Sequence, residues 1–333
     1  MKVVSTVIAV LFCLFCGRNN VMSWLLDKKC GTSLDDQYDA KVIGGKKTSI
    51  RQNPWMVLVQ SRAICGGSLI TPQFVLTAAH CISVKGIPNS GIYVRLGEYE
   101  TIDPNPHCVN NHCIPRFYNI SVLLTAVHHD YKEFTYQNDI ALLKMSKAVE
   151  YSDYVRPICL LVDEQLPSAS KFTFTGWGGT EYARFSRILR NTTLHNVDIS
   201  FCNRMFKKQA DRSQICAASH TSNTCQGDSG GPLSYKFHYD NKLLTFQYGL
   251  ASFGSEKCQI NTPGVYTNVH HHMEWIINKM KDIDNNINKL LLLISKCNKF
   301  PPIQKISHEI GKMSTTYLQQ NHYREVEVEV EMK

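Results

Sequence analysis

The sequence has no long apolar segment, few charged residues and no internal repeat, and these absences exclude several classes of protein. No apolar run reaches the roughly 18 residues that a membrane-spanning helix needs. Charged residues make up 19% of the chain and hydrophobic residues 43%, so a chain disordered throughout is excluded. The 36 Lys and Arg residues outnumber the 28 Asp and Glu residues, but they are scattered and form no dense basic stripe for nucleic acid. We expect a globular protein whose partners are neither membranes nor nucleic acids.

Cysteine is abundant instead, because 13 among 333 residues is high for a cytosolic protein and ordinary for a secreted one. The N-terminus agrees: Lys2 precedes an apolar run over residues 3–16, which is too short to span a membrane. A buried strand, the alternative, is unusual at an extreme N-terminus. We therefore expect a secreted protein with a signal peptide over residues 1–23, whose removal leaves an odd number of cysteines.

Short segments with strand-like composition follow one another from Val42 onward. They alternate with Gly, Pro and Asn, a spacing typical of a β-sandwich or barrel. The segments are residues 55–60, 74–77, 92–96, 120–127, 140–145, 171–175, 243–251 and 264–269. Helices do not alternate with them, which disfavours a parallel α/β sheet. The sequence predicts an all-β protein with one clear helix, at about residues 273–281.

The chain loses this texture after Asp284. The segment contains a Pro-Pro pair, several lysines and an alternation of Glu and Val over residues 325–331. The alternation has the period of a strand, but no partner strand is evident. We expect residues 284–333 to be a flexible C-terminal extension.

Three short segments carry the chemistry. They are TAAHC at residues 77–81, NDIALL at 138–143 and GDSGGP at 227–232. Hydrolysis of an amide at neutral pH needs a nucleophile activated by a base, which a buried carboxylate orients. The segments supply Ser229 as nucleophile, His80 as general base and acid, and Asp139 as the carboxylate.

The glycines around Ser229 indicate an oxyanion hole. Glycine permits a tight turn and a close approach of backbone N–H groups, and those of Gly227 and Ser229 are the natural donors. The same Gly-x-Ser-x-Gly spacing forms the nucleophile elbow of α/β-hydrolases, in which Ser precedes the acid and His comes last. Here the order is His80, Asp139, Ser229, so we disfavour the elbow.

Together these segments resemble the chymotrypsin-type (trypsin-like) serine endopeptidases, in particular secreted insect members. The resemblance covers about residues 30–281 and includes VIGG at 42–45, RPIC at 156–159, GWG at 176–178, SFG at 252–254 and PGVY at 263–266. It implies two antiparallel six-stranded β-barrels with the active site between them. It also implies protein or peptide substrates, inhibitors of the serpin type, and no cofactor.

The resemblance further implies a zymogen. Lys41 and Val42 resemble the activation junction, so residues 24–41 are an activation propeptide and residues 42–283 the protease domain. Cleavage after Lys41 by an activating protease frees the Val42 ammonium, which pairs with Asp228. A buried charge is costly unless paired, so this ion pair would order the oxyanion loop. The alternative is a Gly-Gly surface turn beside an incidental lysine.

The disulfides are also taken from the resemblance, because cysteine spacing does not fix connectivity. The expected pairs are Cys30 with Cys159, Cys65 with Cys81, Cys108 with Cys113, Cys202 with Cys216, and Cys225 with Cys258. Cys297 is left without a partner. Asn119 and Asn191 begin N-glycosylation sequons, which makes a glycoprotein the expectation.

Two candidate metal sites are disfavoured. Glu98 and Glu100 begin a loop that binds calcium in some relatives, but two carboxylates are too few for a cage of six or more oxygens. Residues 270–272 are three histidines, yet consecutive side chains point apart. We expect a solvated loop, a solvated histidine run and no metal.

The substrate pocket departs from the trypsin pattern. Its base lies six residues before the nucleophile, at Asn223, where trypsin-like members carry Asp. A neutral amide makes no charge-assisted bond to Arg or Lys. Ser252, Gly254 and Gly264 match substrate-binding positions, and the two glycines keep the pocket open. Specificity for Arg or Lys is therefore weakened in favour of uncharged side chains or low activity.

These features favour a secreted serine endopeptidase. The main rival is a non-catalytic protease homologue that acts as a binding cofactor in an extracellular protease cascade. The intact triad argues against this rival, whereas Asn223 and the long tail argue for it. An extracellular structural or adhesive protein lacks support, because the sequence has no repeats or linker arrays.

Overall fold

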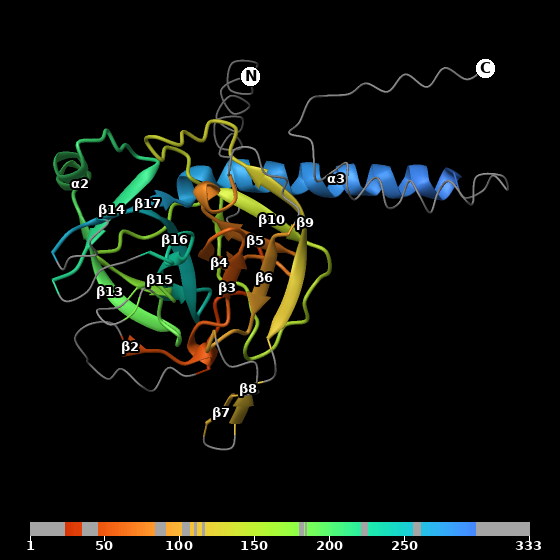
Figure 1. Ribbon diagram of the computed structural model, residues 1–333, viewed down its shortest axis with the longest axis horizontal. Helices are drawn as coiled ribbons and strands as arrows, with labels where there is room; N and C mark the ends of the chain where they lie inside the picture. Colours follow the sequence, from red (N-terminus) through yellow and green to blue (C-terminus); the bar gives the residue numbers. More distant parts are fainter. Residues whose placement is uncertain are drawn as a thin grey trace, which may run out of the picture.

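Two β-barrels and a long C-terminal helix form the described part of the chain (Figure 1). The computed structural model describes residues 24–34, 46–83, 91–101, 107–109, 112–114, 117–179, 183, 185–220, 226–255 and 261–297. The expected signal peptide and the Lys41–Val42 junction lie outside these residues. No helix within them is long and apolar enough to cross a membrane.

The first barrel is a closed ring of six antiparallel strands in the order β10-β5-β4-β3-β6-β9. The strands are β3 (Met56–Gln60), β4 (Ile64–Leu69), β5 (Phe74–Thr77), β6 (Tyr93–Leu96), β9 (Tyr118–Val127) and β10 (Ala141–Met145). Alternate residues of a strand face opposite sides. Val57 and Val59 accordingly pack with Val94 and Leu143 in one core, whereas Leu58 joins a different buried cluster.

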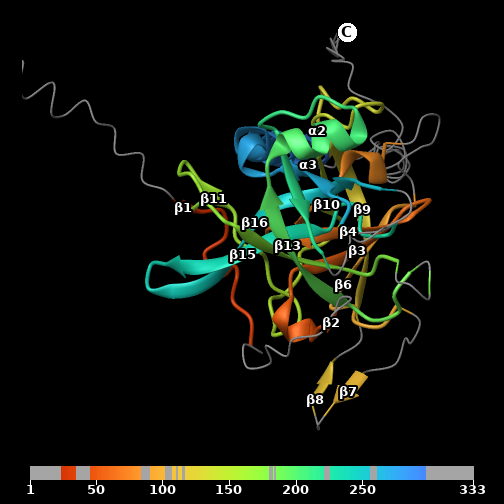
Figure 2. The same ribbon diagram turned by 90° about the vertical axis from the view of Figure 1, so that its left-hand side faces the viewer.

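The second barrel has six strands in the order β12-β15-β16-β17-β14-β13, and β12 pairs with β13 to close the ring. They are β12 (Lys171–Gly176), β13 (Arg190–Val197), β14 (Gln214–Ala218), β15 (Pro232–Tyr239), β16 (Lys242–Phe253) and β17 (Gly264–Asn268). A short strand, β2 (Lys46–Lys47), adds to β13. Phe172, Phe174 and Tyr266 are among the buried side chains of its core. Figure 2 shows the β15–β16 hairpin projecting from this barrel.

Smaller elements decorate the barrels. Strand β1 (Trp24–Leu25) pairs with β11 (Leu161–Val162), and β7 (His107–Val109) pairs with β8 (His112–Ile114). The short helices are η1 (Ile50–Gln52), η2 (Ala79–Cys81), η3 (His270–His272) and α2 (Ile199–Phe206). The carboxylate of Asp198 caps α2 by accepting the N–H of Ser200 at 2.8 Å.

The C-terminal helix α3 (Met273–Cys297) is longer than expected. Ile276 and Ile283 are buried in the core, and Ile287 packs against it, a spacing that keeps one helix face on the barrel. Lys144 of β10 also forms an ion pair with Asp284. The expectation that regular structure ends near residue 284 is therefore wrong for residues 284–297, which continue the helix beyond the first barrel (Figure 1). Residues 298–333 lie outside the described part.

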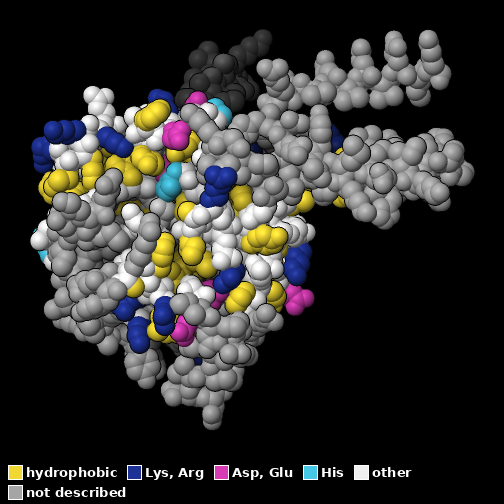
Figure 3. Space-filling view, in the orientation of Figure 1, with side chains coloured by type: hydrophobic (Ala, Val, Ile, Leu, Met, Phe, Trp, Pro, Cys, Tyr) yellow, Lys and Arg dark blue, Asp and Glu magenta, His cyan; other side chains and the backbone are white. Residues whose placement is uncertain are grey.

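The predicted architecture of two six-stranded antiparallel barrels is confirmed. Each of the eight segments expected as a strand coincides with one, with bounds that differ by at most two residues. On the face seen in Figure 3, Lys and Arg side chains of the described residues lie in separate groups, and hydrophobic side chains gather across the middle. This face therefore presents no continuous basic stripe among those residues.

Candidate active site

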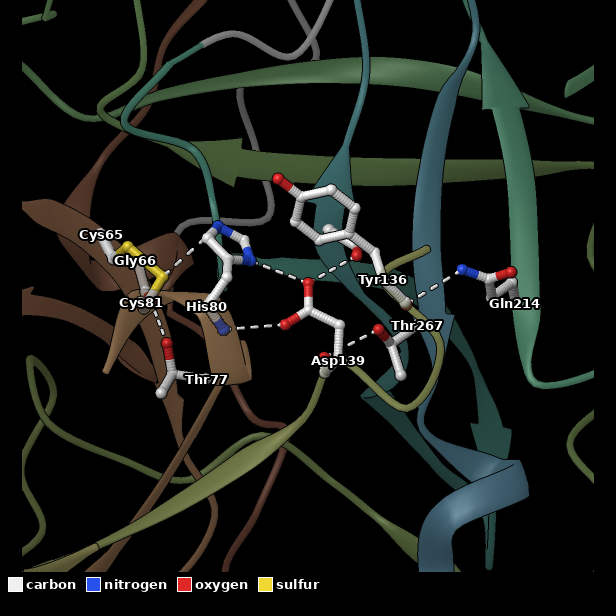
Figure 4. Close-up of polar contacts among 10 residues, drawn as sticks. Cys65, Gly66, Thr77, His80, Cys81, Tyr136, Asp139, Gln214 and Thr267 are labelled. Carbon is white, nitrogen blue, oxygen red and sulfur yellow. Dashed lines mark hydrogen bonds and ion pairs between the residues drawn. A yellow bond between two sulfur atoms is a disulfide. The ribbon is translucent and has the colours of Figure 1, made fainter. Parts of the chain in front are cut away.

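His80 is held in η2, directly after β5, by contacts to the neighbouring strand β4. Its neighbour Cys81 forms a disulfide with Cys65 of β4, whose Cα atoms are 6.2 Å apart. The hydroxyl of Thr77 donates to the carbonyl oxygen of Gly66 at 2.8 Å. Figure 4 shows these two ties beside the imidazole. The turn that carries His80 is therefore fixed to the first barrel on both sides.

The carboxylate of Asp139 is fully buried and gathers donors from both barrels (Figure 4). Its Oδ1 accepts the backbone N–H of His80 at 2.9 Å, and its Oδ2 lies 2.8 Å from His80 Nδ1. From the second barrel, Ser252 donates its hydroxyl to Oδ2 at 2.5 Å. Thr267 donates its hydroxyl to the Asp139 carbonyl oxygen at 2.8 Å. These contacts satisfy a buried charge that would otherwise be costly.

This contact sets the protonation of His80. A carboxylate only accepts hydrogen bonds, so Nδ1 carries a proton and the lone pair of the neutral ring is on Nε2. Burial is the largest influence and lowers the pKa of His80, but the charge of Asp139 and its hydrogen bond together outweigh burial and raise the pKa above the usual 6.5. The ring can therefore accept a proton at Nε2 while Asp139 stabilises the resulting cation.

Ser229 lies on a turn that is seated against the first barrel. Its carbonyl oxygen accepts the N–H of Gly66 at 2.7 Å. The next residue, Gly230, has a φ of 76°, and a Cβ there would lie 2.3 Å from Thr77 Oγ1. Only glycine fits this left-handed, crowded position. The turn therefore places Ser229 beside the β4–β5 segment that leads to His80.

Two backbone donors of the same turn have no backbone acceptor within the described part of the chain. Gly230 donates its N–H to Ala251 at 2.8 Å and Gly231 donates to Asp228 at 2.9 Å, whereas those of Gly227 and Ser229 donate to no backbone carbonyl among the described residues. A pair of free N–H groups beside a nucleophile can receive a developing oxyanion. In the described chain no hydrogen bond joins Ser229 Oγ to His80, and catalytic bonds of this kind are often long until substrate binds.

The buried carboxylate of Asp228 explains the two glycines of the GWG motif. The N–H of Gly178 donates to Asp228 Oδ1 at 2.8 Å. A Cβ at position 178 would lie 2.1 Å from Oδ2, and one at Gly176 would lie 2.2 Å from Oδ1. No side chain fits at either position. Asp228 is thereby fixed beside Gly227 and Ser229, while its expected partner Val42 lies outside the described residues.

Two walls of the expected substrate pocket face each other. A Cβ at Gly254 would meet the Cα of Gly264 at 3.8 Å, an ordinary van der Waals distance. Ser252 sits at the same strand end and donates its hydroxyl to Asp139, so the segment that carries the expected pocket residues also contacts the acid. Asn223, the expected pocket base, lies outside the described residues.

The disulfides of Cys30 with Cys159, Cys65 with Cys81 and Cys202 with Cys216 are present, as expected. Cys225 and Cys258 lie outside the described residues. Cys108 and Cys113 are opposite each other in the β7–β8 ladder, and their side chains are not described. Asn119 is exposed on β9, whereas Asn191 is partly buried on β13.

Glu98 is buried, so the expectation of a solvated loop at this residue is wrong. Its side chain is 3% exposed and lies 3.4 Å from the guanidinium of Arg95. Burial is the main cause that raises the pKa of Glu98 to about 7, and Arg95 offsets it only in part. The carboxyl group therefore faces a cation of the protein itself.

His272 is also buried, and the expectation of a solvated histidine run is wrong for this residue. Its Nδ1 lies 2.8 Å from the carbonyl oxygen of Asn268, and its Nε2 lies 3.0 Å from Oδ1 of Asn138. Asn138 has a φ of 54° and directly precedes Asp139. His272 thus supports the loop that carries the acid, whereas its neighbour His271 is exposed.

Sequence reasoning missed several residues that support the site. Thr267 holds the backbone of Asp139, and Tyr136 packs the edge of its ring against His80 at 5.7 Å. Gly66 positions Ser229 through one N–H group. Each contact joins segments that are distant in sequence or belongs to a loop without a motif, so no local pattern announces it.

Comparison with known proteins agrees with this geometry. The family model described as Trypsin matches residues 42–276. The chain is 36% identical to Serine protease ea of Drosophila melanogaster over 77% of this chain and 70% of that protein. It is 32% identical to Serine protease grass of the same organism, over 79% and 73%. It is 34% identical to the Phenoloxidase-activating enzyme of Bombyx mori over 76% of this chain and only 63% of that protein. The chain therefore belongs to the trypsin family of serine proteases.

Proposed function

We propose that the protein is a serine endopeptidase that uses Ser229, His80 and Asp139 as a catalytic triad. The observation that carries the proposal is the buried Asp139, which holds both the ring and the backbone of His80 at 2.8 and 2.9 Å. The seating of the Ser229 turn beside the same segment supports it. A base oriented by a buried carboxylate is the arrangement that activates a hydroxyl nucleophile.

In the proposed reaction, Ser229 Oγ attacks the substrate carbonyl carbon while His80 Nε2 takes its proton. The N–H groups of Gly227 and Ser229 receive the oxyanion of the tetrahedral intermediate, and Asp139 stabilises the imidazolium. His80 then gives the proton to the leaving amine, the C–N bond breaks and an acyl-enzyme remains. A water molecule then attacks the acyl-enzyme carbonyl carbon while His80 Nε2 takes its proton. The ester bond to Ser229 Oγ breaks, His80 returns the proton to Oγ, and the carboxylic acid product leaves.

The proposal includes activation by cleavage after Lys41. The freed ammonium of Val42 would pair with the buried Asp228, which is already fixed beside the oxyanion donors. The preceding segment would stay attached, because Cys30 is bonded to Cys159. Its contacts support this: Tyr151 donates its hydroxyl to Asp27 at 2.5 Å.

We place the enzyme outside the cell, in a cascade in which one protease activates the next. The names of the relatives, among them the Phenoloxidase-activating enzyme and a Spaetzle-processing enzyme, support protein substrates and an activating protease as partners. Secretion fits the apolar N-terminus and the disulfides. Serpin-type inhibitors and glycans at Asn119 and Asn191 belong to the same proposal.

The test is covalent labelling of the secreted, activated chain with a serine-reactive aryl phosphonate. N-terminal sequencing should read Val-Ile-Gly-Gly after activation, and the label should map to Ser229. Ser229→Ala should fold and be secreted but take no label, and turnover should fall on the order of a million-fold. Lys41→Gln should remain uncut and inactive. A correctly cut wild-type chain that takes no label would favour the non-catalytic homologue instead.

A further inference from the structure

A row of aromatic rings leads away from His80. Tyr136, in the loop before Asp139, sets its ring edge against the imidazole at 5.7 Å and 87°. Phe253, at the end of β16, stacks on Tyr136 at 5.2 Å and 30°. Phe206, at the end of α2, packs its edge on Phe253 at 5.4 Å. We call Tyr136 and Phe253 the aromatic shelf, which starts at the proposed general base and ends near α2.

The ammonium of Lys208 lies over the aromatic shelf. Its Nζ is 4.6 Å from the ring centre of Tyr136 and 4.5 Å from that of Phe253. It also donates to the carbonyl oxygen of Phe134 at 3.1 Å. Lys207, which ends α2 with a φ of 52°, turns the chain so that Lys208 reaches the shelf. Ring faces attract a cation at these distances, so the charge is held in one place.

This cation has no anionic partner within the described residues. Lys208 forms no ion pair with a described carboxylate, and burial lowers its pKa because the ammonium has lost part of its hydration. An ammonium offers three N–H donors, of which one is used by Phe134. A carboxylate that arrived here would gain a charge-assisted hydrogen bond at a cation already partly desolvated.

The shelf adjoins both the proposed acid and the expected substrate pocket. Phe253 stands between Ser252, which contacts Asp139, and Gly254, which lines the pocket. In the proposed binding mode, the side chain before the cleaved bond enters that pocket and the upstream peptide runs past Phe253. The disulfide of Cys81 lies on the opposite side of the imidazole from Tyr136 (Figure 4). An extended peptide rises about 3.3 Å per residue, so in this binding mode the substrate residue two to four positions before the cleaved bond lies near Lys208.

We propose that Lys208 is a specificity-determining residue that favours protein substrates with Asp or Glu two to four residues before the cleaved bond. This inference rests on the proposed function and names a substrate class for the same site. A basic side chain at that position would meet the repulsion of the ammonium. A large apolar one would have to displace the ammonium from the shelf.

The test compares fluorogenic peptides that share the residue before the cleaved bond and differ only in Glu, Gln or Lys at each of the three upstream positions. Activated wild type should cleave the Glu peptide about three- to fivefold faster than the Gln peptide in kcat/KM at one position, as for a partly exposed ion pair. Lys208→Gln should abolish this preference for the Glu peptide. Lys208→Glu should instead cleave the Lys peptide faster than the Gln and Glu peptides. Lys207→Gln, a change at the exposed neighbouring lysine, should keep it.

Salt gives a second readout, because screening should reduce the Glu preference of wild type as ionic strength rises. Equal rates on Glu and Gln peptides at every position, or a preference that survives in Lys208→Gln, would overturn the inference. The wild-type comparison alone decides it if a variant fails to fold. Titration of active sites with the phosphonate keeps the two proposals apart. A labelled, active enzyme without the preference refutes the role of Lys208, whereas a chain without label refutes the protease itself.

Discussion

The contact between Gly178 and Asp228 allows a sharp test of how the Ser229 turn is supported. A Cβ at position 178 would lie 2.1 Å from Oδ2 and 2.2 Å from Cγ of Asp228, where real Cβ contacts do not fall below 3.0 Å. Aspartate is short, so its carboxyl group clears the added methyl only if the side chain rotates away or the backbone moves. The hydrogen bond from Gly178 N–H is then lost, and a bond to a charged acceptor is worth about 1.5–3 kcal/mol.

We therefore expect Gly178→Ala to lower the free energy of unfolding by at least about 2 kcal/mol. We also expect kcat to fall by at least about a hundredfold, because Asp228 lies between the two proposed oxyanion donors in the chain and the loss of one such donor costs about that much. Urea unfolding and phosphonate-titrated kinetics measure the two effects.

The control is Gly254→Ala, whose Cβ meets its nearest atoms at 3.8 Å. Its free energy of unfolding should lie within about 0.5 kcal/mol of that of wild type, since the added methyl group creates no clash. A Gly178→Ala protein as stable and as active as wild type would show that Asp228 does not occupy this position. Equal destabilisation by both changes would equally refute the steric reasoning.

Three further predictions follow from the burial of single groups. In Asp139→Asn the pKa of His80 should fall, because the charge that raises it is gone while burial, which lowers it, remains; an NMR titration of the imidazole in a Ser229→Ala background measures this without activity. Ile283→Ala should cost about 2–5 kcal/mol of stability because Ile283 is 1% exposed, whereas Leu291→Ala, at 57% exposure, should cost less than about 0.5 kcal/mol in the same urea assay. The raised pKa of Glu98 favours its neutral form in the folded state, so the free energy of unfolding of wild type should fall as pH rises from 4.5 through about 7. Glu98→Gln should therefore have a free energy of unfolding up to about 3 kcal/mol higher than wild type at pH 8. This difference should vanish near pH 4.5.

The fold could be predicted because strand composition and turn residues are local signals. The expected strand at residues 74–77 has the same bounds as β5, and the bounds of the other expected strands differ from the observed ones by one or two residues. The end of α3 could not be predicted in the same way. Ile283 and Ile287 continue the apolar spacing of the helix, but their burial depends on the barrel surface, and Asp284 meets a lysine 140 residues away. The Pro-Pro pair at residues 301–302 indicates a break in regular structure, but the helix continues to Cys297 before it.

The candidate site could be predicted only as far as its residues carry motifs. His80 and Asp139 sit in recognisable frames, and the structure brings the two side chains together. Residues that act through tertiary contacts gave no such signal. In the histidine run, one turn of η3 directs His272 inward and leaves His271 exposed, a difference that composition cannot reveal. Lys208 likewise looked like one of many scattered lysines until the fold placed it over two rings.

The two barrels hold each other's proposed catalytic groups. Asp139 precedes β10 of the first barrel, yet Ser252 and Thr267 of the second barrel donate to it. Ser229 precedes β15 of the second barrel, yet its carbonyl oxygen is held by Gly66 of the first. Neither half positions its own group alone, because without the other barrel the Asp139 carboxylate would lose the Ser252 donor and the Ser229 turn would lose the hydrogen bond from Gly66. A substitution that destabilises either barrel should therefore displace both Asp139 and Ser229. We expect such a substitution to lower kcat even when it lies far from the proposed triad.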